Sequence, residues 1–442
     1  MSDEWLGMSA SALGRGIGAG DIDPVELTEA YLAAIRAHPL KGRIFARLTE
    51  ERARAEAEAA QGRARAGHRK GLLDGVPVSW KDLYDTAGVV TEAGSKLLEG
   101  RVPAQDAEVL QNATAAGTVC LGKTHMTELA FSGLGLNPVT ASPPCVNDPD
   151  AVSGGSSSGA ATSVAFGLAP AAVGSDTGGS VRIPAAWNDL VGLKTTSGRL
   201  SLRGVVPLCA RFDTVGPLCR NVEDAAEMLA VLEGGRAADL TGASLSGLNL
   251  MVLENGLRDA RDIPARAFEG AVERLAAGGA RITRRHMAIV DEAMALAGVL
   301  YTTEAWGTWG EVIEANPDRM FAAVRKRFET GKNHAGHEYV RAWQRLDAIR
   351  AEWAAATAGF DAVILPTSPI LPPNMQRLIE DEEYFVAENL LALNNTRMGN
   401  LMGGAGLTLP TGTPSAGLMM IGTPMGEERL LRIGAAAERV LT

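Results

Sequence analysis

Cysteine is scarce in this sequence. The four cysteines in 442 residues form no C-x-x-C pair, so neither a disulfide framework nor a cysteine-based zinc site is indicated. The chain also lacks a run of about 18 apolar residues, which a membrane span requires. Its first residues, MSDEWLGM, have neither the basic nor the apolar region of a signal peptide. These absences predict a soluble cytoplasmic protein with buried free thiols and no contact with a membrane.

Positive charge is also in deficit. Lysine and arginine total 42 against 52 acidic residues, which gives a formal net charge of −10. Such a balance disfavours broad attraction to nucleic acid or to an anionic lipid surface. We therefore expect a small-molecule partner and no nucleic acid, with the chain acting as a monomer or a homodimer.

The order of apolar patterns indicates the fold class. Helical patterns fill the first sixty-odd residues, where Asp23, Pro24 and Glu26 are typical of a helix start. Short β-like runs then alternate with helices, at 76–80, 118–121, 171–174, 190–193, 248–253 and 362–365. Helices are expected at 338–357 and 427–441. This alternation predicts an α/β fold in which helices cover both faces of a central, mixed, mostly parallel sheet.

Two Gly-Gly-Ser turns, which begin at Gly154 and Gly178, are the most unusual local feature. Apolar residues follow the first turn, so it is not a flexible linker. Glycine-rich turns let backbone N–H groups face a negative charge. A phosphate loop would need a lysine directly after the glycines, and neither turn has one. An oxyanion hole with a serine nearby is therefore favoured over a phosphate loop.

Histidine, the usual base for a catalytic serine, is an unconvincing candidate here. A G-x-S-x-G elbow around Ser157 remains a less favoured alternative, because a turn-rich segment rather than a strand precedes it. Of the six histidines only His125 lies near apolar sequence; the others are His38, His68, His286, His334 and His337. Lys81 directly follows the apolar run 76–80, and a lysine can act as a base once burial removes its charge.

Lys81, the segment GGSSSG from Gly154 and the segment DTGGS from Asp176 together resemble the amidase signature family. Further segments in family order include GKTHMTELAFSG, GLKTTSGRLSLRGVVP, FDTVGPLCRNVEDAA and LTLPTGTPSAGLMMIG. The resemblance implies an amide hydrolase with a Ser–cis-Ser–Lys triad. By position, Ser180 matches the nucleophile, Ser156 the bridging cis serine and Lys81 the base. No metal and no organic cofactor is implied.

The resemblance also implies roles around the triad. The oxyanion hole would be formed by backbone N–H groups of four residues: Thr177, Gly178, Gly179 and Ser180. Ser157 would contribute a supporting hydrogen bond, and Asp176 and Arg182 would brace the nucleophile loop through an ion pair. Asp85, Glu128 and Asp213 are explained at least as well by loop capping.

Substrate contacts are expected from Ala130, Phe131 and Ser132, which match the family segment lining the acyl side of the pocket. The sequence departs from the family pattern nearby, at Leu83, at His125 and at 187–189. These departures leave the substrate open. Aromatic residues that can shape the pocket are Trp80, Trp187, Tyr301, Trp306 and Trp309.

The resemblance covers nearly the whole chain and predicts one domain over 1–442. Its parts are an N-terminal helical part (1–67), the signature core with the triad (68–236), a variable, substrate-shaping part (237–375) and a C-terminal return to the sheet (376–442).

The expected reaction cleaves the C–N bond of a small carboxamide or urea-type substrate through a Ser180 acyl-enzyme and releases ammonia or an amine. Two alternatives remain: the glutaminase subunit of a tRNA-dependent glutamine amidotransferase, and a non-catalytic binding relative. The segment YTTEAWGTW at 301–309 lacks the Tyr/Ala/Asn/Arg-rich character associated with glutamine binding in that subunit.

Overall fold

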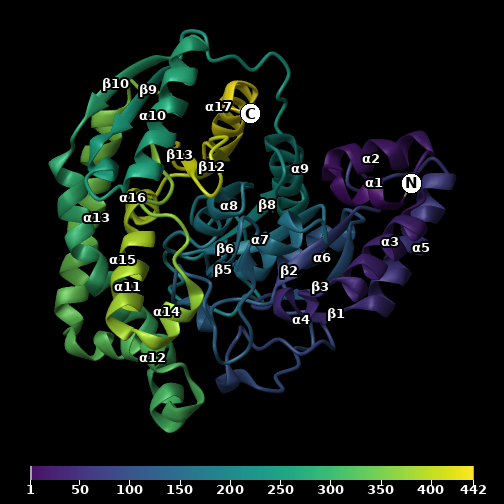
Figure 1. The fold of residues 1–442 in the computed structure, drawn as a ribbon, viewed down its shortest axis with the longest axis horizontal. Helices are drawn as coiled ribbons and strands as arrows, with labels where there is room; N and C mark the ends of the chain where they lie inside the picture. The colour runs from purple at the N-terminus through teal and green to yellow at the C-terminus, as the bar shows by residue number, and fades with distance from the viewer. Residues whose placement is uncertain (1, 442) are drawn as a thin grey trace.

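The fold is built around one large β-sheet, which the computed structural model describes within residues 2–441 (Figure 1). In sheet order the strands are β1 (Phe45–Leu48), β3 (Val119–Thr124), β2 (Pro77–Lys81), β6 (Ala171–Asp176), β8 (Thr214–Cys219), β7 (Val191–Lys194), β12 (Gly406–Pro410), β13 (Gly417–Ile421), β11 (Ala362–Pro366), β9 (Asn249–Leu253) and β10 (Arg281–Arg285). A small separate sheet pairs β4 (Pro144–Cys145) with β5 (Asp148–Val152).

The central sheet is mixed. Parallel pairing joins β2 to both β3 and β6 near one end, and β9 to both β10 and β11 near the other. The pairs between these two groups are antiparallel. All six β-like runs expected from the sequence lie on or next to strands of this sheet. The prediction of an α/β fold with a mixed central sheet is confirmed.

Helices pack on both faces of the sheet, as the alternation along β12 demonstrates. A Cβ atom added to Gly406 would lie 3.1 Å from Cδ of Arg182 in α8, whereas a Cβ atom on Gly434 of α17 would meet the side chain of Leu407. Successive strand residues face opposite sides, so α8 and α17 cover opposite faces. The longer helices are α2 (Ala10–Ala19), α3 (Pro24–Ala37), α5 (Glu50–Arg65), α6 (Glu108–Ala115), α7 (Ser158–Ala165), α9 (Val222–Glu233), α10 (Asp262–Ala277), α11 (Ala288–Ala315), α12 (Ala322–Glu329), α13 (Gly336–Thr357), α15 (Glu382–Ala392), α16 (Asn394–Met402) and α17 (Glu427–Leu441); shorter ones are α1 (Ser2–Gly7), α4 (Lys41–Ile44), α8 (Arg182–Trp187) and α14 (Met375–Glu380).

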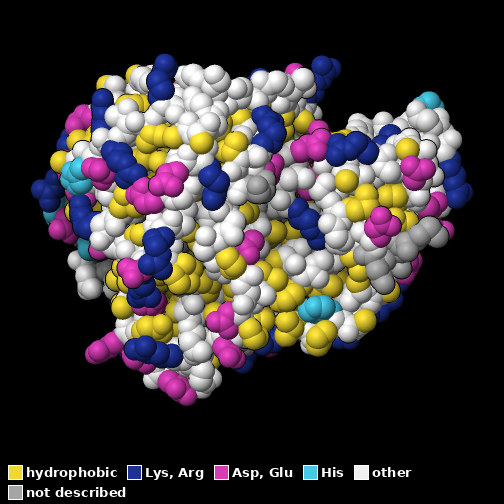
Figure 2. All heavy atoms as spheres, turned by 45° about the horizontal axis from the view of Figure 1, so that its top comes forward, with side chains coloured by type: hydrophobic (Ala, Val, Ile, Leu, Met, Phe, Trp, Pro, Cys, Tyr) yellow, Lys and Arg dark blue, Asp and Glu magenta, His cyan; other side chains and the backbone are white. Residues whose placement is uncertain are grey.

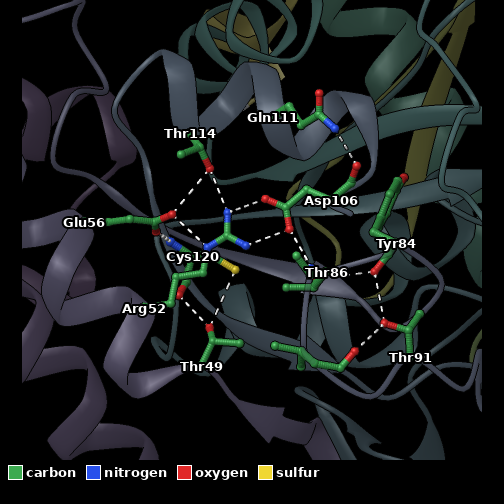
Figure 3. Close-up of polar contacts among 12 residues, drawn as sticks. Thr49, Arg52, Glu56, Tyr84, Thr86, Thr91, Asp106, Gln111, Thr114 and Cys120 are labelled. Carbon is green, nitrogen blue, oxygen red and sulfur yellow. Dashed lines mark hydrogen bonds and ion pairs between the residues drawn. The ribbon is translucent and has the colours of Figure 1, made fainter. Parts of the chain in front are cut away.

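The N-terminal helices form as the sequence predicts. Asp23 caps α3, because its carboxylate accepts a hydrogen bond of 2.9 Å from the backbone N–H of Val25. A partly buried polar network then attaches α5 to β3 (Figure 3). The backbone N–H of Cys120 in β3 donates to Glu56 at 2.7 Å, and Arg52 donates to both Glu56 and Asp106. This network fixes the strand beside β2, which carries Lys81.

The C-terminal half places its helices across the far end of the sheet, where Figure 1 shows α11, α13, α15 and α16 side by side. The sheet continues from the N-terminal part through to β12 and β13. The single domain over 1–442 and its internal boundaries at 67, 236 and 375 stay a prediction. On the face drawn in Figure 2, basic and acidic side chains are interspersed. Within residues 2–441, no helix is both long and apolar enough to cross a bilayer.

Candidate active site

Lys81 is the last residue of β2, and its side chain is completely buried. Its Nζ lies 2.7 Å from Oγ of Ser156, 2.8 Å from Oγ of Ser175 and 3.1 Å from Oγ of Ser157. The parallel pairing of β2 with β6 brings Ser175 to Lys81, and the segment before α7 supplies the other two serines. Three hydroxyls therefore surround one amine in a dry environment.

The contacts of Ser157 restrict the direction of these hydrogen bonds. The Ser157 hydroxyl donates to the carbonyl oxygen of Ser175 at 3.2 Å, and the backbone N–H of Ser175 donates back to Ser157 Oγ at 3.3 Å. A serine hydroxyl has one proton. Because this proton is already directed at a carbonyl, Ser157 accepts from Lys81 rather than donating to it.

Burial lowers the pKa of Lys81 to about 7, although the carboxylates of Asp176 and Asp213 attract its charge and oppose the change. A low pKa alone does not single out this residue, because burial also lowers the pKa of Lys194 to about 7. Lys194, however, donates to two backbone carbonyls, of Thr195 and Gly404. Among the lysines in residues 2–441, Lys81 is the one bonded to serine hydroxyls.

The segment before α7 approaches Lys81 because glycine leaves room for the backbone. A Cβ atom on Gly155 would lie 2.5 Å from the backbone nitrogen of Gly135, so a larger residue would collide with the neighbouring loop. The peptide bond from Gly155 to Ser156 is cis. Ser158 begins α7, and Oγ of Ser153 is buried without a hydrogen-bond partner in the described part of the chain.

Ser180 lies in the loop between β6 and α8, and it lines a pocket. The backbone N–H groups of Thr177, Gly178, Gly179 and Ser180 donate no hydrogen bond to any residue that the structure describes. The hydroxyls of Ser156 and Ser180 are not hydrogen bonded to each other within the described residues. Contacts of this kind often tighten only when substrate binds. The loop thus presents a free hydroxyl next to free backbone donors.

Asp176 and Arg182 hold the two ends of this loop together. Both side chains are fully buried, and Arg182 Nη2 lies 2.9 Å from Asp176 Oδ1. The carboxylate also accepts from the backbone N–H of Val181 at 3.1 Å and from Asn400 Nδ2 at 2.9 Å. The pKa of Asp176 lies below its ordinary value, because the attraction of Arg182 and these hydrogen bonds outweigh burial. The pair therefore keeps both charges.

The pocket beside Ser180 is narrow. It is lined by Ala130, Phe131, Ser132, Thr177, Gly178, Ser180, Leu208, Tyr301, Arg327, Leu393 and Arg397. The three residues expected at the acyl side are thus all present. No motif in the sequence pointed to Arg327, Leu393 or Arg397, although Arg327 lies in the part at 237–375 that was expected to shape the substrate site. Ser175 was also missed, although it directly precedes the Asp-Thr-Gly-Gly-Ser segment.

The remaining candidates do not reach the pocket. Asp213 accepts hydrogen bonds from the Thr177 hydroxyl at 2.5 Å and from the backbone of the loop before it. Glu128 accepts from Ser95 and from the backbone N–H of Phe321, and Asp85 pairs with Arg101. These contacts are those of residues that fix loops, as the capping hypothesis expects.

His125 was the one histidine near apolar sequence. Burial lowers the pKa of its imidazole to about 4.

Comparison with known proteins identifies the family. The family model described as Amidase matches residues 26–431. The chain belongs to the amidase family. This confirms the resemblance seen in the sequence. The protein is thus an amidase-family enzyme that acts on carbon–nitrogen bonds.

This amidase-family chain has relatives with different activities. A glutamyl-tRNA(Gln) amidotransferase subunit from Anaeromyxobacter dehalogenans is 34% identical to it, over 97% of this chain and 95% of that protein. The 2-amino-5-chloromuconic acid deaminase of Comamonas testosteroni is 36% identical, over 88% of this chain and 87% of that protein. The crystal structure of an amidase matches with a TM-score of 0.87 at 29% identity and covers 98% of this chain and 100% of that one.

The similarity to amidotransferase subunits corrects the prediction about partners. Composition predicts a small-molecule amide as the sole partner, with no nucleic acid, no membrane and a monomer or homodimer. That prediction is wrong, because relatives that match over nearly the whole chain are subunits of an enzyme whose name includes a transfer RNA. Net charge was a poor guide to binding partners, because it describes the average attraction of the protein to polyanions. It does not describe the local surfaces through which subunits bind each other.

Proposed function

We propose that this enzyme hydrolyses the C–N bond of a small carboxamide or urea-type substrate through an acyl-enzyme on Ser180. Ser180 Oγ attacks the carbonyl carbon while its proton passes to Ser156, and Ser156 passes its own proton to Lys81. The C–N bond then breaks, and the departing ammonia or amine takes up a proton returned along the same route. Water attacks the ester in the same manner and frees Ser180.

The arrangement of hydroxyls around Lys81 is the observation that carries this proposal. A neutral amine has two N–H donors and one lone pair. Ser157 accepts one N–H, as its bond to the Ser175 carbonyl requires. With Ser175 accepting the other at 2.8 Å, the lone pair is directed at Ser156, 2.7 Å away. The base thus faces the hydroxyl from which it would take a proton.

The free N–H groups of residues 177–180 support an oxyanion hole. They would stabilise the negative charge that develops on the carbonyl oxygen, and one such donor is typically worth about 3–4 kcal/mol of barrier. The ion pair of Asp176 and Arg182 would hold these donors in place. Preorganised donors of this kind stabilise the transition state more than the ground state.

The proposal is tested by ammonia release from a panel of aliphatic, aromatic and urea-type amides. We expect Ser180→Ala and Lys81→Met to lose at least ~1,000-fold in kcat, while circular dichroism and thermal unfolding remain those of a folded protein. Trapping with a reactive ester and mass spectrometry of the peptides should place the acyl group on Ser180. Wild-type activity in either variant, or an acyl group elsewhere, would refute the assignment.

A second candidate is the glutaminase step of an amidotransferase complex, with partner chains and tRNA. It is favoured by the extent of the match to the amidotransferase relative, 97% of this chain. Affinity purification of the chain from its own cells, followed by a glutaminase assay with and without the co-purified chains, separates the two candidates. Glutaminase activity that depends on the partner chains would favour the complex.

A further inference from the structure

The pocket beside Ser180 contains two arginines that form no ion pair and no side-chain hydrogen bond with a described residue. Arg327 comes from α12 and Arg397 from α16, and both line the pocket. Arg327 Nη1 and Arg397 Nη2 are buried and have no hydrogen-bond partner within the described residues. Neither guanidinium forms an ion pair there, in contrast to Arg182, which is bound to Asp176. No carboxylate is among the described residues that line this pocket.

This concentration of positive charge is unfavourable without a negative charge nearby. Burial, together with the nearby charge of Arg397, lowers the pKa of Arg327 to about 9. Burial lowers the pKa of Arg397 as well. Each side chain is only partly buried, but one nitrogen of each is shielded from water. Charged groups shielded from water are normally paired, because an unpaired one loses hydration without compensation. An anionic ligand would supply the missing partner.

The two arginines are fixed near the reacting centre. A Cβ atom on Gly178 would lie 3.7 Å from Cγ of Arg397, and the hydroxyl of Thr396 donates to the carbonyl oxygen of Gly178 at 2.7 Å. On the other side, Cζ of Arg327 lies 4.4 Å from the centre of the Phe131 ring. The hydroxyl of Tyr301 is also buried without a partner in the described part of the chain. It can donate one more hydrogen bond to an anion.

We propose that Arg327 and Arg397, with the Tyr301 hydroxyl, bind a carboxylate of the substrate, so that the enzyme acts on amides carrying an acid group a few atoms from the scissile carbonyl. This inference rests on the proposed function, because it places the carbonyl at Ser180. Planar guanidinium groups match the two oxygens of a carboxylate. The nearness of Arg397 to Gly178 keeps the two substrate groups close together.

Activity on matched substrates tests the specificity. Butyramide and succinamate have similar size, and only succinamate carries a carboxylate. We expect the wild-type enzyme to prefer succinamate by at least ~100-fold in kcat/KM. Arg327→Gln and Arg397→Gln should each lose about 10- to 100-fold on succinamate, mainly through KM, and change little on butyramide. Lys326→Gln, on the same helix as Arg327 but paired with Glu382 at the surface, should behave as wild type.

Binding without turnover separates this inference from the proposed function. The Ser180→Ala variant should bind malonate, succinate or glutarate in calorimetry, and the same acids should raise its melting temperature. Adding Arg397→Gln should weaken that binding about 10- to 100-fold, whereas Arg397→Lys should weaken it less because the charge is kept. Arginine-dependent binding without hydrolysis of any amide would support the pocket assignment while refuting the proposed function.

Two results would overturn the inference. One is equal kcat/KM for butyramide and succinamate, with both arginine variants losing activity equally on both substrates. The other is the absence of binding for all three dicarboxylates in the folded Ser180→Ala protein. Each result leaves hydrolysis by Ser180 intact as a separate conclusion.

Discussion

The Nζ of Lys81 lies 2.7 Å from Oγ of Ser156, although 75 positions separate the two residues along the chain. β2 ends at Lys81, and its parallel partner β6 ends at Asp176, where the Ser180 loop begins. The two strand ends meet at one edge of the sheet, and the segment before α7 covers them. The chemistry therefore depends on contacts between three separate segments.

The rate should depend on pH through the protonation of Lys81. Its pKa in the folded protein is about 7. Below that value Lys81 binds a proton and loses the lone pair that takes the proton from Ser156. We expect kcat/KM to fall about tenfold for each pH unit below ~7 and to level off above it. A profile that is flat from about pH 5 to 9 would argue for another base.

Stability should change with pH for the same reason. The ordinary pKa of this lysine is 10.5, so between about 7 and 10.5 the unfolded chain binds one more proton than the folded one. The free energy of unfolding therefore gains a contribution that rises with pH across this window. Urea unfolding at several pH values should show less of this rise in Lys81→Met than in the wild type. Identical slopes in the two proteins would contradict the lowered pKa.

Ser175 should act as a positioning residue for Lys81. Ser175→Ala removes one of the three hydroxyls around the amine, and we expect kcat to fall about 10- to 100-fold. A hydroxyl that accepts from the amine favours the ammonium form, so the acid limb of the pH profile should move to lower pH. Ser163→Ala is the matched control, since Ser163 is a buried serine bonded to Ser79 and not to Lys81. An unchanged acid limb in Ser175→Ala would contradict this role.

The Asp176–Arg182 pair should contribute strongly to stability. Arg182→Met leaves a buried carboxylate without its cation, and we expect the free energy of unfolding to fall by about 3–5 kcal/mol. Arg284→Met breaks an exposed pair with Glu269 and should cost no more than ~1 kcal/mol. Denaturant unfolding measures both. Equal losses in the two variants would mean that burial adds nothing to the pair.

Substitution of Gly179 should destabilise the protein more than substitution of its neighbour Gly178. Its φ is +144°, and a Cβ atom there would lie 2.2 Å from Oγ1 of Thr396, so Gly179→Ala must distort the Ser180 loop. A Cβ atom on Gly178 meets its neighbours at an ordinary 3.7 Å. We expect Gly179→Ala to lower the melting temperature and to abolish turnover, and Gly178→Ala to keep a melting temperature near that of the wild type. Similar melting temperatures would contradict the steric argument.

The sequence by itself determined the family and most of the helices and strands. It also pointed to Lys81 and to two of the three serines bonded to it, Ser156 and Ser157, but not to Ser175. These features depend on local signals: the capping Asp23, the apolar strands that end at Lys81 and at Asp176, and glycines at turns that side chains would block. Strand β8 was not predicted, because its sequence TVGPLC contains Gly and Pro and is stabilised by pairing with β6 and β7.

Only the tertiary structure decided which residues face Ser180 from the C-terminal half. Arg327 and Arg397 lie among many other arginines of this part of the chain, and nothing local separates a pocket arginine from a surface one. Packing of α12 and α16 against the Phe131 and Gly178 segments partly buries these two side chains and leaves them without a counter-charge among the described residues. Burial and pairing depend on the whole fold, and so does the charge that the pocket presents to a substrate.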